Sequence, residues 1–180
     1  MNLQDEWLEI QRNEDPVARQ AFLDRIDLED AAPYIWGVVY SETDFFGDLH
    51  YHPIWLALPI RSFLTTGVRA KVAVTPLAFS ENHYCLGDFL SSLIDHEGQH
   101  ARDIYDSSSE LKLADLFTEA LSSVVGAGVP FRERLLKKVA AQEKRAISNQ
   151  INNFDRRGCS HDYMEQVKEY RDYYNWVLVH

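Results

Sequence analysis

A chain of 180 residues is long enough for one domain with its own hydrophobic core, without disulfide or metal staples. Its composition is ordinary for a globular protein, with 46% hydrophobic and 26% charged residues, and its apolar runs are too short to cross a bilayer. The net charge of −10 argues against nucleic acid and anionic membrane surfaces as partners.

The N-terminal stretch MNLQDEWLEI has neither the basic nor the apolar region of a signal peptide. Cys85 and Cys159 form no C-x-x-C pair, and we interpret them as free thiols in a reducing compartment. We therefore expect a cytoplasmic protein. Asp15 followed by Pro16 is typical of a helix start, and this first helix is expected to reach about Ile26.

The middle of the chain, over about residues 34–79, predicts a small mixed or antiparallel sheet. Aromatic, β-branched or alternating stretches favour strands here: residues 34–42 with 44–52 as a hairpin partner, 53–64, and 69–79. Pro53 and Pro59 interrupt the second stretch. Pro76 limits the last one to an edge or a short strand.

Helices are expected in the rest of the chain, over residues 88–106, 108–125, 130–152 and 162–178. Asp88 is a candidate cap for the first of these, and Ser107 with Glu110 fits a capping box for the second. A glycine- and proline-containing breaker at 126–130 coincides with a change of charge. We therefore divide a single compact domain into a core over residues 1–129 and a C-terminal helical subdomain over 130–180 packed on it.

The segment from His96 to His100 reads HEGQH and fits the pattern H-E-x-x-H. Two histidines at i and i+4 on a helix point the same way and can chelate one zinc ion. Glu97 lies about 100° round the helix, where it can act as general base toward a zinc-activated water. Random placement gives this pattern with a probability of roughly 0.02, and the alternative is two polar residues on a solvated face. Apolar residues in the preceding turns predict instead that the motif faces inward.

A catalytic zinc ion needs a third protein ligand, and Glu119 is the candidate, with 18 residues between it and His100. If the helices expected at 88–106 and 108–125 run antiparallel, equal residue counts on both sides of the turn bring Glu119 level with His96. The alternative is that Glu119 is a solvent-facing helix residue.

The pattern H-E-x-x-H-x18-E resembles the gluzincin zinc metallopeptidases over residues 88–125. The resemblance implies zinc as the cofactor, with His96, His100 and Glu119 as its ligands and Glu97 as the catalytic base. It implies a peptide or protein substrate. It also implies an α+β fold, in which the small N-terminal sheet precedes a helical bundle with a zincin-like two-helix metal site.

Two positions depart from the family pattern, because Thr118 precedes the expected ligand and Ser123 follows it where members carry asparagine and aspartate. The residues that would orient the ligands are therefore not identified. Asp103 is open to three interpretations: an orienting residue, a direct ligand, or a surface carboxylate paired with a cation. A metzincin pattern would use Asp106, but Asp103 replaces the glycine that turns the chain in that family.

The group that would stabilise an oxyanion is also open, with His161, Tyr163 and Tyr170 as weak candidates, followed by Tyr173 and Tyr174 on the same helix. The histidines at 50, 52 and 83 are interpreted as ordinary polar side chains. Two alternatives to a peptidase stay open. One is a catalytically inactive, peptidase-like module that binds zinc or a partner protein, and the other is a helical interaction module with a chance motif.

Overall fold

The computed structural model describes residues 2–42, 54–57, 67, 69–80, 83, 85–106 and 129–180. Several expected features lie outside these residues: the strand partner at 44–52, the capping box at 107–110, and the helix at 108–125 that carries Glu119. The prediction for Glu119 therefore stays a prediction.

Two short helices open the chain. α1 (Leu3–Ile10) is capped by Asn2, whose side chain accepts a hydrogen bond from the backbone N–H of Asp5. α2 (Pro16–Leu23) begins as expected, with the Asp15 carboxylate accepting from the N–H of Val17 and proline in the first turn. α2 ends at Leu23, before the expected end at Ile26.

The strands form a mixed sheet, which confirms the expected α+β class for a chain that is mostly helical. β3 (Ala70–Val74) is central, between β1 (Ile35–Tyr40), to which it is parallel, and β2 (Ile54–Ala57), to which it is antiparallel. Of the two alternatives expected from Pro76, an edge strand or a short strand, β3 is the short strand, and it lies in the centre of the sheet. Pro76 begins the 3-10 turn η3 (Pro76–Phe79) after the strand has ended, so the proline removes no hydrogen bond from the ladder.

The main core lies where α1 and α2 meet the sheet and the start of the central helix. The Trp7 ring stacks on Phe89 with 4.7 Å between ring centroids, and the rings of Phe22 and Phe79 complete the cluster. Trp7, Phe22, Phe79 and Phe89 are each at most 2% exposed. The cluster fixes the N-terminal part of the central helix against the sheet.

One central helix, made of three segments, carries the H-E-x-x-H motif. It begins with α3 (Leu86–Leu90), widens into the π-helical turn η4 (Ser91–His96) and ends as α4 (Glu97–Asp106). The expected helix over 88–106 is confirmed with an earlier start. Asp88 is not its cap: Cys85 is, and the Asp88 carboxylate, in the first turn, accepts from the N–H of Cys85.

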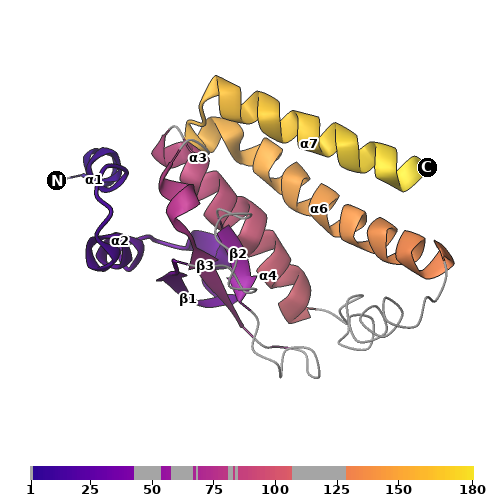
Figure 1. The fold of residues 1–180 in the computed structure, drawn as a ribbon, viewed down its shortest axis with the longest axis horizontal. Helices are drawn as coiled ribbons and strands as arrows, with labels where there is room; N and C mark the ends of the chain where they lie inside the picture. The colour runs from indigo at the N-terminus through magenta and orange to yellow at the C-terminus, as the bar shows by residue number, and fades with distance from the viewer. Residues whose placement is uncertain are drawn as a thin grey trace.

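A helical hairpin covers the other side of the central helix, opposite the sheet (Figure 1). α6 (Val129–Arg157) and α7 (His161–Val179) are joined by a turn in which Gly158 has a φ of +65°, a conformation that favours glycine. The turn approaches the central helix so closely that a Cβ at Gly87 would lie 2.3 Å from the carbonyl oxygen of Arg157. The segment expected to be a C-terminal subdomain is therefore packed directly on the helix that carries the motif.

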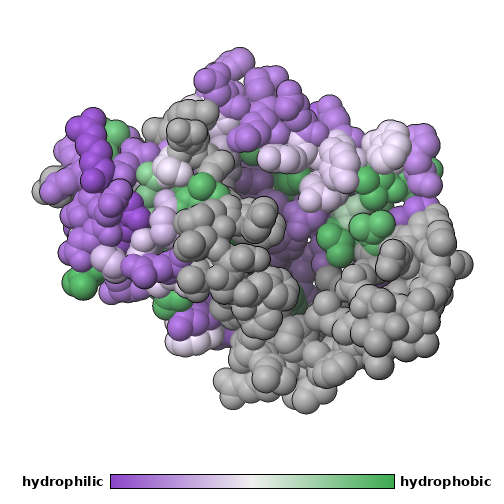
Figure 2. All heavy atoms as spheres, viewed as in Figure 1, coloured by the Kyte–Doolittle hydropathy of each residue, from purple (hydrophilic) through white to green (hydrophobic). Residues whose placement is uncertain are grey.

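Within the described parts of the chain, no helix combines the length and the apolarity that a membrane span needs. Figure 2 shows a hollow near the middle of the face seen in Figure 1, with hydrophilic residues at its bottom.

Candidate metal centre

The two histidines of the motif lie together on the face of the central helix that meets α6. Their rings are 4.8 Å apart between centroids, and the Nε2 atoms of His96 and His100 are separated by 3.2 Å. His96 ends the π-helical turn and His100 lies in the first turn of α4. π turns inside α-helices are rare and occur frequently at functional sites.

Glu143 of α6 completes a group of three possible metal ligands. One carboxylate oxygen lies 3.3 Å from Nε2 of His96, and the other lies 3.3 Å from Nε2 of His100. Ligands placed 2.0–2.1 Å from a tetrahedral zinc ion are separated from one another by about 3.3 Å. With one ligand atom taken from each residue, the three atoms lie within 4.8 Å of one another, so the group has the donor types of a His2Glu zinc site and could hold a metal ion.

The electrostatics of the three side chains favour an ionised carboxylate. Burial alone would raise the pKa of the Glu143 carboxyl, but hydrogen bonds with His100 and His96 hold the pKa well below its usual range. Burial alone would lower the pKa of His96, and its hydrogen bond with Glu143 and the nearby charge of Glu97 raise the pKa overall. A half-buried carboxylate that attracts positive charge in this way is suited to a divalent cation.

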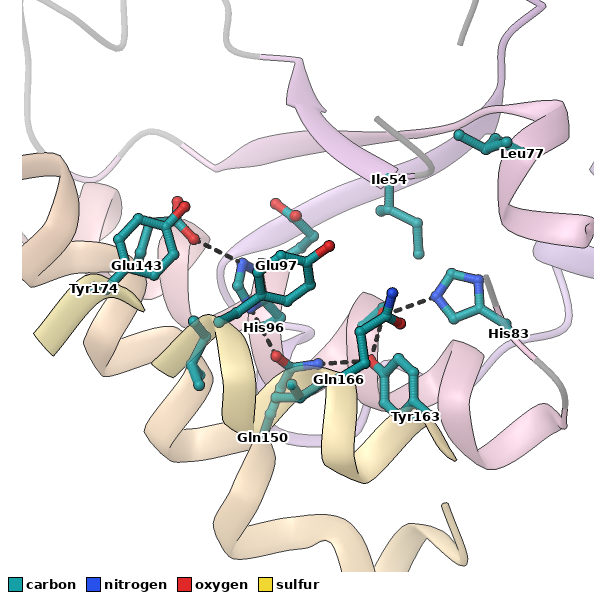
Figure 3. A pocket seen from close by; sticks show the side chains of 14 residues that line it. Ile54, Leu77, His83, His96, Glu97, Glu143, Gln150, Tyr163, Gln166 and Tyr174 are labelled. Atoms are coloured by element: carbon teal, nitrogen blue, oxygen red, sulfur yellow. Dashed lines mark hydrogen bonds and ion pairs between the residues drawn. The ribbon is translucent and has the colours of Figure 1, made fainter. Parts of the chain in front are cut away.

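Glu97 lies at the same end of the cavity as His96 and Glu143 (Figure 3). Its side chain is half-buried, and its charge acts on the imidazole of His96. The structure thus brings together three of the four residues expected in the site: His96, His100 and Glu97.

A cavity of about 390 Å³ opens beside two of the possible ligands, His96 and Glu143. Its walls come from β2, from η3 and the loop after it, from the central helix, and from both helices of the hairpin. Apart from His96, Glu97 and Glu143, the described residues that line it are uncharged or aromatic: Ile54, Leu77, His83, Ser92, Ile147, Gln150, Tyr163, Gln166, Val167, Tyr170 and Tyr174.

Asp103 and Asp106 are not part of the three-ligand group found among the described residues. Asp103 accepts hydrogen bonds from Gln99 and Arg145, at 2.7 and 3.0 Å, which matches the interpretation of a carboxylate paired with a cation. α4 continues without a turn to Asp106, which is exposed at its end. This geometry gives the metzincin pattern no third ligand.

The candidates for oxyanion stabilisation differ in position. His161 is exposed at the start of α7 and is absent from the described lining of the cavity. Tyr163 is buried, and burial raises the pKa of its hydroxyl well above the ordinary value. Tyr170 and Tyr174 line the cavity, and burial raises the pKa of Tyr174 to about 12, while Tyr173 is 59% exposed.

His83, interpreted from the sequence as an ordinary polar side chain, is 1% exposed and does not belong to the three-ligand group found among the described residues. Burial lowers its pKa to about 4. The imidazole accepts or donates two hydrogen bonds, at 2.9 Å with the carbonyl of Ala78 and at 2.8 Å with the hydroxyl of Ser92. His50 and His52 lie outside the described residues.

Sequence reasoning missed Glu143 and Gln150, although a signal was present. Val139 and Ile147 are apolar residues of α6, and Glu143 lies four residues from each; in the structure Ile147 is buried and Val139 is exposed. Gln150 follows seven residues after Glu143 on the same side, and its side-chain oxygen lies 2.9 Å from Nδ1 of His96. A carboxylate in a mainly apolar stripe is the pattern that also singled out Glu97.

A second cluster of charges joins the central helix to α6 beside the possible ligands. Asp95, 2% exposed, is paired with Arg157 through two hydrogen bonds of 2.9 Å. Glu29 pairs with both Arg156 and Arg157. Burial alone would lower the pKa of the Arg157 guanidinium, but its hydrogen bonds with Asp95 and Glu29 raise it. This cluster ties the end of α6 to Asp95 in the central helix, the residue that precedes His96.

No family model matches the chain, and no curated protein or solved structure matches it significantly. The resemblance to gluzincins therefore stays a prediction that rests on the motif.

Proposed function

We propose that this chain is a zinc-dependent peptidase. The observation that carries the proposal is the group formed by His96, His100 and Glu143, whose ligand atoms lie within 4.8 Å of one another. His96 and Glu143 line a cavity that Glu97 also lines. Glu143 here takes the place that the sequence pattern gave to Glu119. A glutamate from a second helix is the third ligand that the gluzincin resemblance implies, with 42 residues rather than 18 after His100.

Zinc, when bound, supplies a Lewis acid that lowers the pKa of water and polarises a carbonyl group. The chain supplies the remaining parts. Glu97 accepts a proton from the attacking water and delivers it to the leaving amine. The uncharged and aromatic walls of the cavity favour an uncharged side chain next to the cleaved bond. We thus propose neutral peptide segments as the substrate class.

The first test is the metal content of the full chain, purified without added metal and measured by elemental analysis. We expect about one zinc ion per chain, and a lower content in Glu143→Ala. Glu119→Ala is the matched variant, because it removes the other candidate carboxylate. Loss of zinc in Glu119→Ala alone would transfer the third ligand to Glu119. A wild-type protein that takes up no transition metal at neutral pH would refute the proposal.

The second test separates an enzyme from a zinc-binding module. A peptide library is incubated with the zinc-loaded wild type and with Glu97→Gln. General acid–base catalysis contributes roughly 10²- to 10⁴-fold, so we expect Glu97→Gln to lose at least about 100-fold in cleavage rate while it keeps its zinc. Zinc binding without any cleavage by the wild type would favour the inactive, peptidase-like module.

A further inference from the structure

A continuous row of hydrogen-bonding side chains runs from His96 along the floor of the cavity (Figure 3). It crosses four parts of the fold: α6, α7, the π-helical turn and the loop that follows η3. Four contacts of 2.6–2.9 Å link its side chains, and a fifth, of 2.9 Å, joins His83 to the backbone carbonyl of Ala78 in η3. Such a row has a direction, because every donor must meet an acceptor.

The direction is set at the buried end, at Ala78. The carbonyl oxygen of Ala78 can only accept, so Nδ1 of His83, 2.9 Å away, donates to it. His83 is neutral at neutral pH, because burial lowers its pKa to about 4. Its Nε2 therefore accepts, and the hydroxyl of Ser92, 2.8 Å away, donates to it.

The donor and acceptor of each remaining hydrogen bond follow in turn, from Ser92 to His96. Since the Ser92 proton is used, Ser92 accepts from the hydroxyl of Tyr163 at 2.6 Å. Tyr163 in turn accepts from the side-chain amide N–H of Gln150 at 2.7 Å. The amide oxygen of Gln150 then faces Nδ1 of His96 at 2.9 Å, and this nitrogen has to donate. Gln150 and Tyr163 are 3% and 4% exposed, so water does not readily replace these bonds.

We propose that this row of hydrogen bonds holds a proton on Nδ1 of His96 and thereby leaves Nε2 as the nitrogen that binds the metal ion. The positioning residues are His83, Ser92, Tyr163 and Gln150. The inference rests on the proposed function, because it concerns metal binding only if His96 is a ligand. It also supplies the orienting partner of His96 that the sequence did not identify.

The direct test is the protonation of the two ring nitrogens of His96, measured by long-range ¹H–¹⁵N NMR on the metal-free, full-length Glu143→Ala variant. In the metal-free wild type the Glu143 carboxylate, 3.3 Å from Nε2, would itself hold a proton on that nitrogen. The pH is raised until the His96 signals no longer change, so that the ring is neutral. We expect Nδ1 to keep its proton and Nε2 to lose it. With Gln150→Met added to this variant, we expect the proton to move largely to Nε2, which free histidine favours. A His96 that keeps its proton on Nε2 in Glu143→Ala, where no carboxylate faces this nitrogen, would overturn the proposal.

Zinc affinity gives a second, independent readout. Loss of an outer partner typically weakens metal binding about 10- to 100-fold, and we expect this of Gln150→Met. Gln150→Glu keeps an acceptor for Nδ1–H and should retain both the tautomer and tight zinc binding. Tyr163→Phe removes one hydroxyl from the row, and we expect a loss of about 3- to 10-fold. Tyr173→Phe removes an exposed hydroxyl from the same helix and should change nothing.

The two readouts distinguish the failure of this inference from the failure of the proposed function. A protein that binds no zinc but shows the Nδ1–H tautomer would refute the metal site and leave the row of hydrogen bonds intact. A protein that binds zinc equally well with Tyr163→Phe, Tyr173→Phe and Gln150→Met would refute the positioning role and leave the metal site intact.

Discussion

Two clusters join the central helix to α6, and they neutralise their carboxylates in different ways. In the first, Asp95 and Glu29 face the guanidinium groups of Arg156 and Arg157, so two permanent negative charges meet two permanent positive charges. In the second, the ion pairs of Glu143 among the described residues are with the imidazoles of His96 and His100. An imidazole carries no permanent charge near neutral pH.

The difference shows that neighbours in sequence can serve different purposes. Asp95 and His96 are adjacent, yet one belongs to a closed ion-pair cluster and the other to a cluster that still has room for a divalent cation. The first cluster holds the two helices together at a fixed distance. The second brings ligand atoms of His96, His100 and Glu143 within 4.8 Å of one another, so that they could hold a metal ion. If this comparison is correct, changes in the first cluster should affect folding, and changes in the second should affect metal binding.

The largest effect is expected from Arg157→Met, which leaves the buried carboxylate of Asp95 without its bidentate partner. Breaking a buried ion pair by removing one partner costs about 3–5 kcal/mol. We expect the free energy of unfolding, measured by urea denaturation of the metal-free protein, to fall by about this amount. A loss below about 1 kcal/mol would show that Arg156, whose guanidinium lies 3.6 Å from Asp95, replaces Arg157.

Glu143→Gln should produce the opposite pattern. The amide keeps the size of the side chain but offers a much weaker metal ligand, so zinc affinity should fall by more than the 10- to 100-fold that loss of an outer partner costs. Competition with a chromophoric chelator measures this change. Urea denaturation of the metal-free variant should still show a cooperative transition. Unchanged zinc affinity would exclude Glu143 from the site.

The pH dependence of stability should report the neutral, buried His83. Its pKa is about 4 in the folded protein and near 6.5 in the unfolded chain. Between these values the unfolded chain binds the extra proton, so the free energy of unfolding falls as the pH falls from about 6.5 to about 4. The loss is up to about 3 kcal/mol, since one pKa unit corresponds to 1.36 kcal/mol.

Urea denaturation of wild type and His83→Gln at a series of pH values, with a chelator present, isolates this contribution. The titration of groups that do not interact with His83 is common to both proteins and cancels in the difference. Equal pH dependence in the two proteins would show that His83 binds a proton in the folded protein as readily as it does in the unfolded chain.

The smallest effect is expected from Arg145→Met. Its partner is Asp103, and the side chain of Arg145 is 47% exposed, so water screens the pair. Exposed ion pairs contribute about 0.2–1 kcal/mol. Both the free energy of unfolding and the zinc affinity should stay within this range of the wild-type values. A large loss of zinc would restore Asp103 to the list of residues that orient or bind the metal.

The sequence predicted the parts of this arrangement that depend on local pattern. The α+β class, the helix over the motif, and the long helices of the hairpin all follow from periodicity and breakers. The two histidines meet because their spacing on a helix is fixed. The sequence did not predict Glu143 or Gln150, because the contact between α6 and the central helix joins residues more than 40 positions apart.

Local rules also failed where backbone geometry departs from the ideal. The stripes expected along the central helix assumed 3.6 residues per turn throughout, but Ser91–His96 form a π turn with more residues per turn. Periodicity carries no signal for such a turn. The cap of this helix was misplaced for a related reason: Asp88 is a good capping residue, but here it reaches back from the first turn to Cys85 and across to Ser160.

Because of the π turn, side chains before it and after it leave the central helix in directions that a regular α-helix would not combine. Before it, Phe89 is packed in the aromatic core against α1 and the sheet. At its end and just after it, His96 and His100 face α6. In an uninterrupted α-helix, the direction of the second group would be dictated by the direction of the first. The extra residue in the π turn removes this constraint. The direction in which Phe89 enters the core and the direction in which the two histidines point can therefore change independently. Deletion of one residue between Ser91 and Asp95 would couple them again and rotate the histidines away from α6.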